Sequence, residues 1–310
     1  MKNSYTLKPL VAIWMVTYNH ESFIAQAIES VMMQKTDFNY KLFIGEDYST
    51  DRTREICVAL NQKYPNKIEM ILQGENTGGF KNAQDLYKLC YESGAKYIAL
   101  CEGDDYWTDP LKLQKQVSFL DLNPGYSVCA HKTEVLSGSC LEKKEWRWDS
   151  KRTTFTSVDY LYALLFHTSS MMFRSDESKT FTPHKGILQG DIYLCLSVIN
   201  ESKYFIIEEY MSVYRQHGGG ITNSLLHKSR DAKYKSWIVL LEKFNTQTNN
   251  KHLFAVWIKR KILFFSNKKS NQVSTGKLRA QFCYFFYKSM FQFYCRMKAI
   301  GMQTRPILIE

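Results

Sequence analysis

Residues 10–21 read LVAIWMVTYNHE, an apolar run that gives way at once to polar side chains. A segment that is apolar at nearly every position is typical of a strand buried on both faces of a sheet. Residues 22–34 follow with the apolar spacing of a helix, and similar pairs of segments repeat as far as residue 120. This alternation predicts an α/β fold, with a mostly parallel sheet flanked by helices.

The expected elements alternate regularly in the first 120 residues. Strands are predicted at 10–16, 40–45, 67–72 and 97–101, and helices at 22–34, 51–64, 79–93 and 110–120. The pattern is less regular beyond them. Strands are predicted there at 126–130, 170–174, 204–208 and 211–215, with helices at 159–166 and 190–199. From about residue 225 onward the chain is expected to be helical.

The net charge of +11 is carried by the last sixty residues. Residues 251–310 hold twelve Lys and Arg, one acid and twelve aromatic residues, whereas the first 250 residues are balanced. Such helices suit an anionic membrane surface, although a packed helical cap or a dimerisation surface would also explain them. We predict a catalytic or binding domain at 1–225 and a helical, basic extension at 226–310. No nucleic-acid-binding motif accompanies the charge, so nucleic acid is not an expected partner.

Other features of the composition exclude several classes of protein. The eight cysteines include no CxxC pair, which argues against a zinc ribbon or a disulfide framework and favours the reduced thiols of a cytosolic protein. No run of 18 apolar residues predicts a transmembrane helix, and no cleavage site follows the short apolar run at 10–16. We therefore expect a cytoplasmic protein, attached peripherally to the membrane if the extension binds lipid. GxGxxG, P-loop and GxSxG motifs are absent.

Polar side chains follow three of the expected strands directly. Residues 17–21 (TYNHE) follow the first strand, 46–49 (EDYS) the second and 102–105 (EGDD) the strand at 97–101. In parallel sheets of this kind, ligands bind beyond the carboxyl ends of the strands. The sequence therefore predicts one site built from these three segments.

The acidic segment 102–105 is the strongest candidate for a metal site. Three carboxylates within four residues repel one another, and Mg²⁺ or Mn²⁺ would relieve that repulsion and bridge to a diphosphate. A solvated acidic turn before the next helix is the alternative. Asp47 can accept hydrogen bonds from a base or a ribose, or it can form an Asx turn.

Two later segments carry further candidates. Asp191 begins the helix expected at 190–199, where it can cap the helix or act as a general base. In YRQHGGG, residues 214–220, the glycines allow a backbone to approach a ligand closely. His217 can bind a metal or a diphosphate there, and Arg215 can pair with a phosphate. A surface hairpin with an incidental histidine is the alternative. The other histidines considered, His131, His167 and His184, are expected to be structural.

Taken in order, these segments resemble the family 2 glycosyltransferases of the GT-A fold, a Rossmann-like fold. Residues 16–21 resemble the opening nucleotide-binding strand and loop of the family. Residues 45–51 (GEDYSTD) resemble its DDxSxD motif, with Glu46 in place of the first acid. Residues 102–113 resemble its metal-binding DxDD segment, with Glu102 where Asp is usual.

The resemblance continues to about residue 225. Residues 190–191 are similar to the late acidic motif of the family, which holds its catalytic base. Residues 214–219 resemble a YRxHxGG signature found in a bacterial subset, many of them surface-polysaccharide enzymes.

The resemblance implies an inverting, metal-dependent glycosyltransferase of the hexosyltransferase type. The donor is a nucleotide-sugar, with UDP-sugars the expected class, and the acceptor is a hydroxyl of a saccharide or a lipid-linked saccharide. Asp191 is then the catalytic base, and Mn²⁺ or Mg²⁺ is held by Asp104, Asp105 and His217. The implied nucleotide-sugar contacts are Thr17, Tyr18, Asn19, Glu21, Asp47, Glu102, Asp104 and Arg215. Residues 167–170 are expected on the acceptor side.

Two other functions compete with this interpretation. A nucleotidyltransferase also uses a Rossmann-like sheet and paired acids, but it usually has a Gly-rich, basic loop after the first strand. Residues 17–21 contain neither Gly nor Lys. A non-catalytic nucleotide- or carbohydrate-binding scaffold of the same fold would not need the set Asp47, Asp104, Asp105 and Asp191.

Overall fold

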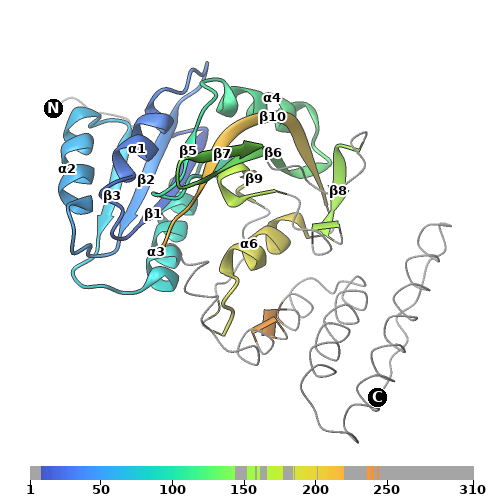
Figure 1. The fold of residues 1–310 in the computed structure, drawn as a ribbon. Helices are drawn as coiled ribbons and strands as arrows, with labels where there is room; N and C mark the ends of the chain where they lie inside the picture. Colours follow the sequence, from blue (N-terminus) through green and yellow to red (C-terminus); the bar gives the residue numbers. More distant parts are fainter. Residues whose placement is uncertain are drawn as a thin grey trace, which may run out of the picture.

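A ten-stranded mixed sheet with helices on both faces forms the centre of the computed structural model (Figure 1). The strand order is β3-β2-β1-β4-β9-β6-β10-β5, with β7 paired to β6 and β8 to β10. The structure describes residues 8–143, 152–157, 159–160, 166–176, 184, 186–200, 202–219, 236–237, 239–240 and 243. The mixed sheet between layers of helices confirms the expected α/β fold.

The N-terminal half alternates strands and helices, as its apolar pattern predicts. Its parallel strands are β1 (Val11–Thr17), β2 (Tyr40–Glu46), β3 (Ile68–Leu72) and β4 (Tyr97–Leu100). The helices are α1 (Ile24–Met32), α2 (Thr53–Lys63), α3 (Gly79–Glu92) and α4 (Lys112–Leu122), and a short strand, β5 (Tyr106–Trp107), precedes α4. All four helices lie within the predicted segments or within two residues of them.

The second half differs more from prediction. Its elements are β6 (Tyr126–Ser137), β7 (Cys140–Lys143), β8 (Thr154–Thr156), the 3₁₀ turn η1 (Thr168–Ser170), β9 (Met172–Arg174), α6 (Gly190–Ile199) and β10 (Lys203–Gln216). The strands predicted at 204–208 and 211–215 are one long strand, β10, which pairs in parallel with β6 through register shifts near Tyr210. The strand predicted at 126–130 likewise continues to Ser137.

Polar side chains caused these two strands to be predicted too short. Lys132 follows the strand predicted at 126–130, and Glu208 and Glu209 interrupt the apolar runs of β10; the side chains of Lys132 and Glu208 form an ion pair at 3.6 Å across the neighbouring strands. A strand is extended by its backbone pairing, and polar residues are accepted wherever they face solvent. Most of the helix predicted at 159–166 lies outside the described residues.

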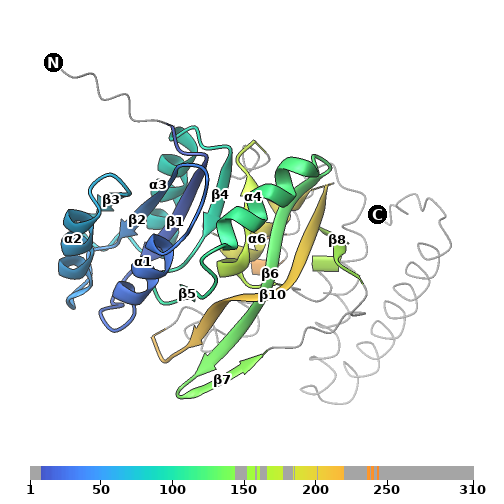
Figure 2. The same cartoon turned by 90° about the horizontal axis from the view of Figure 1, so that it is seen from above.

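The sheet is buried on both faces, as its continuous apolar strands predict. Val11, Ile13 and Met15 of β1 belong to one core with apolar residues of α1, α2 and α4. Ala12, between them, belongs to a second core with residues of α3 and α6. Figure 2 shows α1 and α3 on opposite sides of β1 and β2. Covering both faces leaves the carboxyl ends of the strands as the place where polar groups can gather.

Part of the C-terminal prediction lies beyond what the structure describes. The boundary at 225 and nearly all of the basic extension at 226–310 fall outside the described residues. Among those described, Leu240 is buried and the Ser236 hydroxyl accepts the Leu188 N–H at 2.6 Å. No helix in the described part of the chain is both long and apolar enough to cross a membrane. The six described cysteines are free thiols.

Candidate active site

The acidic turn at residues 102–105 is held against the end of β1 by backbone hydrogen bonds. The Gly103 N–H donates to the Val16 carbonyl at 3.0 Å, and the Asp47 N–H donates to the Thr17 carbonyl at 3.1 Å. The chain then enters β5, which pairs with β10 and so brings the end of β10 to the same place. The segments after β1, β2 and β4 therefore meet at one edge of the sheet, and the end of β10, more than 100 residues from the acidic turn in the sequence, joins them there.

The loops that follow β1 and β2 are tied together. The Asn19 side-chain oxygen accepts the Thr50 N–H at 2.8 Å, and the Asn19 N–H donates to the Ser49 hydroxyl at 3.0 Å. The Glu21 carboxylate accepts the Arg52 N–H at 3.1 Å. Asn19 and Glu21, expected at the nucleotide, thus use side-chain atoms to fix these loops. Tyr18, beside them, is exposed to solvent.

Asp47 is buried and rigidly held. One of its carboxylate oxygens accepts both the N–H and the hydroxyl of Thr77 at 2.8 Å. Its neighbour Glu46 is fully buried, accepts the Ser49 N–H at 2.7 Å and forms an ion pair with Arg54. The two acids of this motif therefore have different surroundings: Glu46 holds α2 against the sheet, while Asp47 stands beside the loop after β1.

The Asp104 carboxylate meets two imidazoles. His217 Nε2 lies 2.9 Å from Asp104 Oδ2, and His20 Nε2 lies 3.8 Å from the same oxygen. The three candidate ligand atoms all lie within 4.8 Å of one another. Burial acts to raise the pKa of Asp104, but the hydrogen bond with His217 and the charge of His20 outweigh it and lower the pKa. The structure thus brings together Asp104 and His217, two of the three predicted metal ligands.

The Asp105 carboxylate, by contrast, belongs to a second group. It is fully buried and accepts the Arg215 backbone N–H at 2.9 Å, and its other oxygen lies 3.5 Å from His167 Nδ1. That oxygen has no hydrogen-bond partner among the described residues. Glu102 completes this group, with all three ligand atoms within 4.8 Å. Burial, then the charges of Asp104 and Glu102, raise the pKa of Asp105 well above its usual range.

Arg215 holds the acidic turn in place. Its guanidinium donates to the Asp104 carbonyl oxygen at 2.5 Å and to the side chain of Gln26, and it packs over the rings of Phe23 and Tyr106. Burial lowers its pKa from the usual value for arginine. The predicted pairing of Arg215 with a phosphate stays a prediction.

Asp191 lies at the start of α6, within electrostatic reach of the acidic turn. The residue is exposed at the surface, yet burial of its carboxyl among neighbouring groups raises its pKa, opposed by the backbone N–H groups of Ile192 and Asp191 itself. Burial and the charges of Asp104 and Asp191 raise the pKa of Glu102 to about 8, opposed by a hydrogen bond with Thr168. Asp191 therefore lies in the first turn of α6, where a carboxylate suits the helix N-terminus, and its role as a general base stays a prediction.

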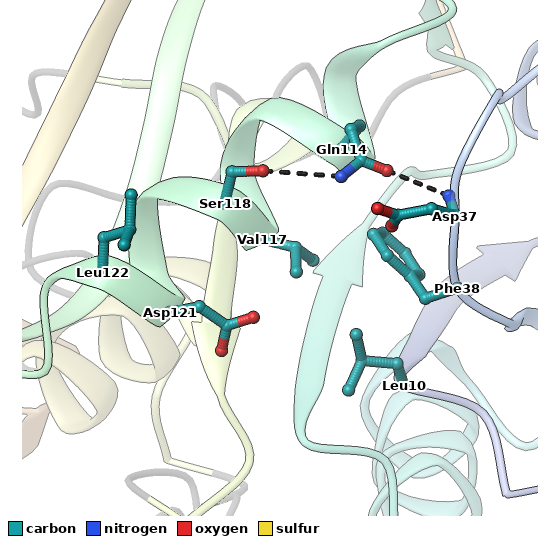
Figure 3. Close-up of a pocket in the computed structure, with 8 residues that line it drawn as sticks. All are labelled: Leu10, Asp37, Phe38, Gln114, Val117, Ser118, Asp121 and Leu122. Carbon is teal, nitrogen blue, oxygen red and sulfur yellow. Dashed lines mark hydrogen bonds between the residues drawn. The ribbon is translucent and has the colours of Figure 1, made fainter.

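A separate depression of about 380 Å³ lies near the opposite ends of the strands (Figure 3). Gln114 accepts the Asp37 N–H at 3.1 Å on one side of it and donates to the Ser118 hydroxyl at 3.4 Å. Its lining comes from the start of the first strand, the chain before β2 and α4: Leu10, Asp37, Phe38, Gln114, Val117, Ser118, Asp121 and Leu122. None of these residues belongs to the acidic turn or the loops around it, so the depression is not part of the candidate active site.

Residues 12–181 match the family model of glycosyl transferase family 2. The chain belongs to this family. The match includes β1, β2, β4 and the acidic turn, and it ends before Asp191 and His217. An uncharacterized protein of Mycobacterium tuberculosis is 35% identical over 220 residues, which are 69% of this chain and 61% of that protein. The chain thus matches about three fifths of the length of this curated relative.

Two solved structures share the fold. TarS 1–349 of S. aureus, in complex with UDP, aligns with a TM-score of 0.63 at 14% identity and covers 97% of this chain and 94% of that one. A mannosyltransferase from Pyrobaculum calidifontis, in complex with GDP-Man and Mn²⁺, aligns with a TM-score of 0.51 at 11% identity and covers 92% and 84%. The GT-A fold of this family 2 member is therefore confirmed.

Three residues of the site were not singled out as ligands or contacts from the sequence, although His20 lies in the segment 17–21 and His167 in the segment 167–170 expected on the acceptor side. His20 lies in the loop after the first strand, at the same sheet edge as the acids. This position alone could have indicated a role in the site. His167 was expected to be structural but lies against Asp105. Thr77 reaches Asp47 from the connection between β3 and α3, and nothing local in the sequence indicates that contact.

Proposed function

We propose that this family 2 member is an inverting, metal-dependent glycosyltransferase. It would move a sugar from a nucleotide-sugar, a UDP-sugar as the first candidate, to a hydroxyl of a saccharide or lipid-linked saccharide. The observation that carries the proposal is the meeting of a fixed Asp47, the Asp104 group and Asp191 around one sheet edge. The likeness to TarS, solved with UDP, and to a mannosyltransferase, solved with GDP-Man and Mn²⁺, supports it.

Asp47 would bind the nucleoside. With one oxygen bonded to Thr77, the carboxylate is held in a single orientation, from which it can accept hydrogen bonds from a base or a ribose. Tyr18 and Tyr48 expose their rings beside it and offer apolar faces to a base. Asn19 and Glu21 would contribute by keeping the two loops at a fixed separation.

Asp104 and His217 would hold a divalent cation such as Mn²⁺ or Mg²⁺. Their donor set of carboxylate oxygen and imidazole nitrogen suits such an ion, and the ion would offset the negative charge that develops on a departing nucleoside diphosphate. Arg215 keeps Asp104 in place through its carbonyl, and Asp105 anchors the turn to β10.

Asp191 would accept the proton of the attacking hydroxyl. A raised pKa makes a carboxylate a stronger base, and Asp191 faces solvent where an acceptor can approach it. Attack on the side of the sugar opposite the leaving diphosphate inverts the anomeric centre in a single displacement. The residues of η1, next to Glu102, would lie toward the acceptor.

We further propose that the enzyme acts in the synthesis of a surface polysaccharide. It rests on the similarity of residues 214–219 to the YRxHxGG signature. A lipid-linked acceptor would give the basic residues 251–310 a purpose, because attachment to an anionic membrane would bring enzyme and acceptor together.

The test pairs donor binding with transfer. Thermal unfolding is measured with UDP, GDP and dTDP, each with and without Mn²⁺, since a ligand that binds only the folded state raises its stability. We expect a Mn²⁺-dependent rise with UDP. Asp191→Asn should keep that rise and lose transfer by at least about 100-fold. No stabilisation by any nucleotide would favour the binding-scaffold alternative, and unchanged transfer would exclude Asp191 as the base.

A further inference from the structure

The loop after β1 supplies a third side chain to the Asp104 group. His20 Nε2 lies 3.8 Å from Asp104 Oδ2, and the rings of His20 and His217 stand nearly perpendicular with centroids 5.9 Å apart. Two ligand atoms that each lie about 2.1 Å from one ion are separated by about 3 to 4 Å. The distances of Asp104 Oδ2 from His217 Nε2 and His20 Nε2, 2.9 and 3.8 Å, agree with that range.

We propose that His20 is a ligand of the metal together with Asp104 and His217, and that this pair of imidazoles selects a first-row transition ion over Mg²⁺. The inference rests on the proposed function, since it concerns the same site. It adds a ligand from the first loop of the domain and a preference among metals.

His20 is oriented for this role by a buried neighbour. Its Nδ1 lies 3.2 Å from the Thr17 hydroxyl, and Thr17 is only 1% exposed. When Nδ1–H donates to that hydroxyl, Nε2 carries the lone pair and faces Asp104. A metal-binding histidine is commonly fixed in this way through its second ring nitrogen. Its backbone is also held, because the His20 N–H donates to the Thr53 hydroxyl at 2.7 Å.

Gly103 makes room for this arrangement. A Cβ at position 103 would lie 2.7 Å from the Thr17 hydroxyl oxygen and 3.1 Å from His20 Nδ1. Both distances are too short for any residue other than glycine without a shift of Thr17 or His20. The residue between Glu102 and Asp104 is therefore tied to the position of His20 and not only to the turn itself.

The composition of the donor set gives the preference among metals. Asp105 is turned toward the Arg215 N–H and His167, so the Asp104 group contains one carboxylate and two imidazoles. Mg²⁺ favours oxygen ligands and retains water, whereas imidazole favours transition ions. A site of this composition should hold Mn²⁺ or Co²⁺ in the presence of excess Mg²⁺.

The experiment counts the nitrogens on the metal. Mn²⁺ is added to the full-length protein, with and without UDP, and ¹⁴N couplings are recorded by pulsed electron paramagnetic resonance. The concentration of free Mn²⁺ measured in the same titration gives the Kd. We expect two coupled nitrogens in the unsubstituted protein. His20→Ala should leave one and raise the Kd for Mn²⁺ by at least about ten-fold. His184→Ala, at a histidine outside both candidate ligand groups, should leave the count and the Kd unchanged.

A second variant tests the preference for transition ions directly, and it keeps the inference testable if His20→Ala does not fold. His20→Asp replaces the imidazole by a carboxylate, so the ratio of Mn²⁺ to Mg²⁺ affinity should fall by at least about ten-fold while metal binding is retained. Thr17→Val should weaken Mn²⁺ binding by up to about ten-fold, because His20 loses the partner of Nδ1. Circular dichroism confirms that each variant is folded.

The outcomes separate this inference from the proposed function. One nitrogen in the unsubstituted protein, or an unchanged count in His20→Ala, would overturn the role of His20 and leave the transferase intact. UDP binding with no coupled nitrogen would assign both imidazoles to the diphosphate instead, and would also overturn it. Two nitrogens in a protein that neither binds UDP nor transfers sugar would uphold His20 and overturn the proposed function.

Discussion

Replacing Lys112 by Met is expected to stabilise the protein at neutral pH and to destabilise it above pH 10. Lys112 is fully buried on α4, where its amine donates to Gln116 Oε1 at 2.7 Å and lies 3.9 Å from the centre of the Trp107 ring. No carboxylate of the described residues pairs with it. Burial lowers its pKa from 10.5 to about 7.

The size of the effect follows from that difference in pKa. The native state resists protonation of this amine by about 5 kcal/mol, at about 1.4 kcal/mol per pH unit. Between pH 7 and 10.5 the unfolded chain holds the proton and the native protein has lost it, so the free energy of unfolding rises with pH in this window. Methionine removes the penalty but also the hydrogen bond and the ring contact, together worth about 1 to 3 kcal/mol. The net gain at pH 7 is therefore about 2 to 4 kcal/mol.

The free energy of unfolding is measured by urea denaturation at pH 7, 8, 9 and 10, with tryptophan fluorescence as the signal. The quantity of interest is the difference in unfolding free energy between Lys112→Met and the unsubstituted protein, because other titrating groups cancel. It should fall steadily with pH and change sign near the top of the range. Lys115→Met, on the same helix but ion-paired with Asp109 and Glu209 at the surface, is the control and should show no such slope. A difference for Lys112→Met that stays flat from pH 7 to 10 would refute the reasoning.

Three further outcomes are expected. Thr77→Val removes the hydroxyl that fixes Asp47 and should raise the Kd for UDP by about three- to ten-fold in calorimetry; an unchanged Kd would show that Asp47 needs no such support. Arg54→Met leaves the buried Glu46 without its ion pair and should cost about 3 to 5 kcal/mol in urea unfolding, whereas Arg52→Met, in an exposed pair with Glu55 at the start of the same helix, should leave the unfolding free energy nearly unchanged. A chain ending at residue 250 should no longer co-sediment with anionic liposomes. If it still did, the membrane-binding surface would lie in the N-terminal domain and not in residues 251–310.

Much of the fold follows from local sequence patterns. The first four strands are mostly apolar, with Lys41 inside β2 and Glu69 inside β3, and the helices between them have apolar faces, so each element can be predicted from its own segment. The full lengths of β6 and β10 could not be predicted, because polar residues at 131–132 and 208–209 interrupt the apolar runs. Only the pairing of the two strands shows that both continue.

Some features of the candidate site could likewise be predicted from the sequence, and others could not. Acids placed just after strands are predictable, because parallel strands deliver their carboxyl ends to one edge of a sheet. The separation of Asp104 from Asp105 is not predictable, because the two are adjacent in sequence and only the backbone path into β5 turns them toward different histidines. Thr77 could not be found either, since its contact with Asp47 spans 30 residues and has no local signature.

The ties between the loops after β1 and β2 have a consequence for how this family member can evolve. Asn19 and Thr50 bond to each other, and Glu21 bonds to Arg52, so neither loop has an independent shape. Substitutions in contact with one another are seldom additive in their effects. On the proposed function, in which these loops contact the nucleotide, a change of donor would require paired replacements across them, and we expect positions 19 and 50 to co-vary among homologues with different donors.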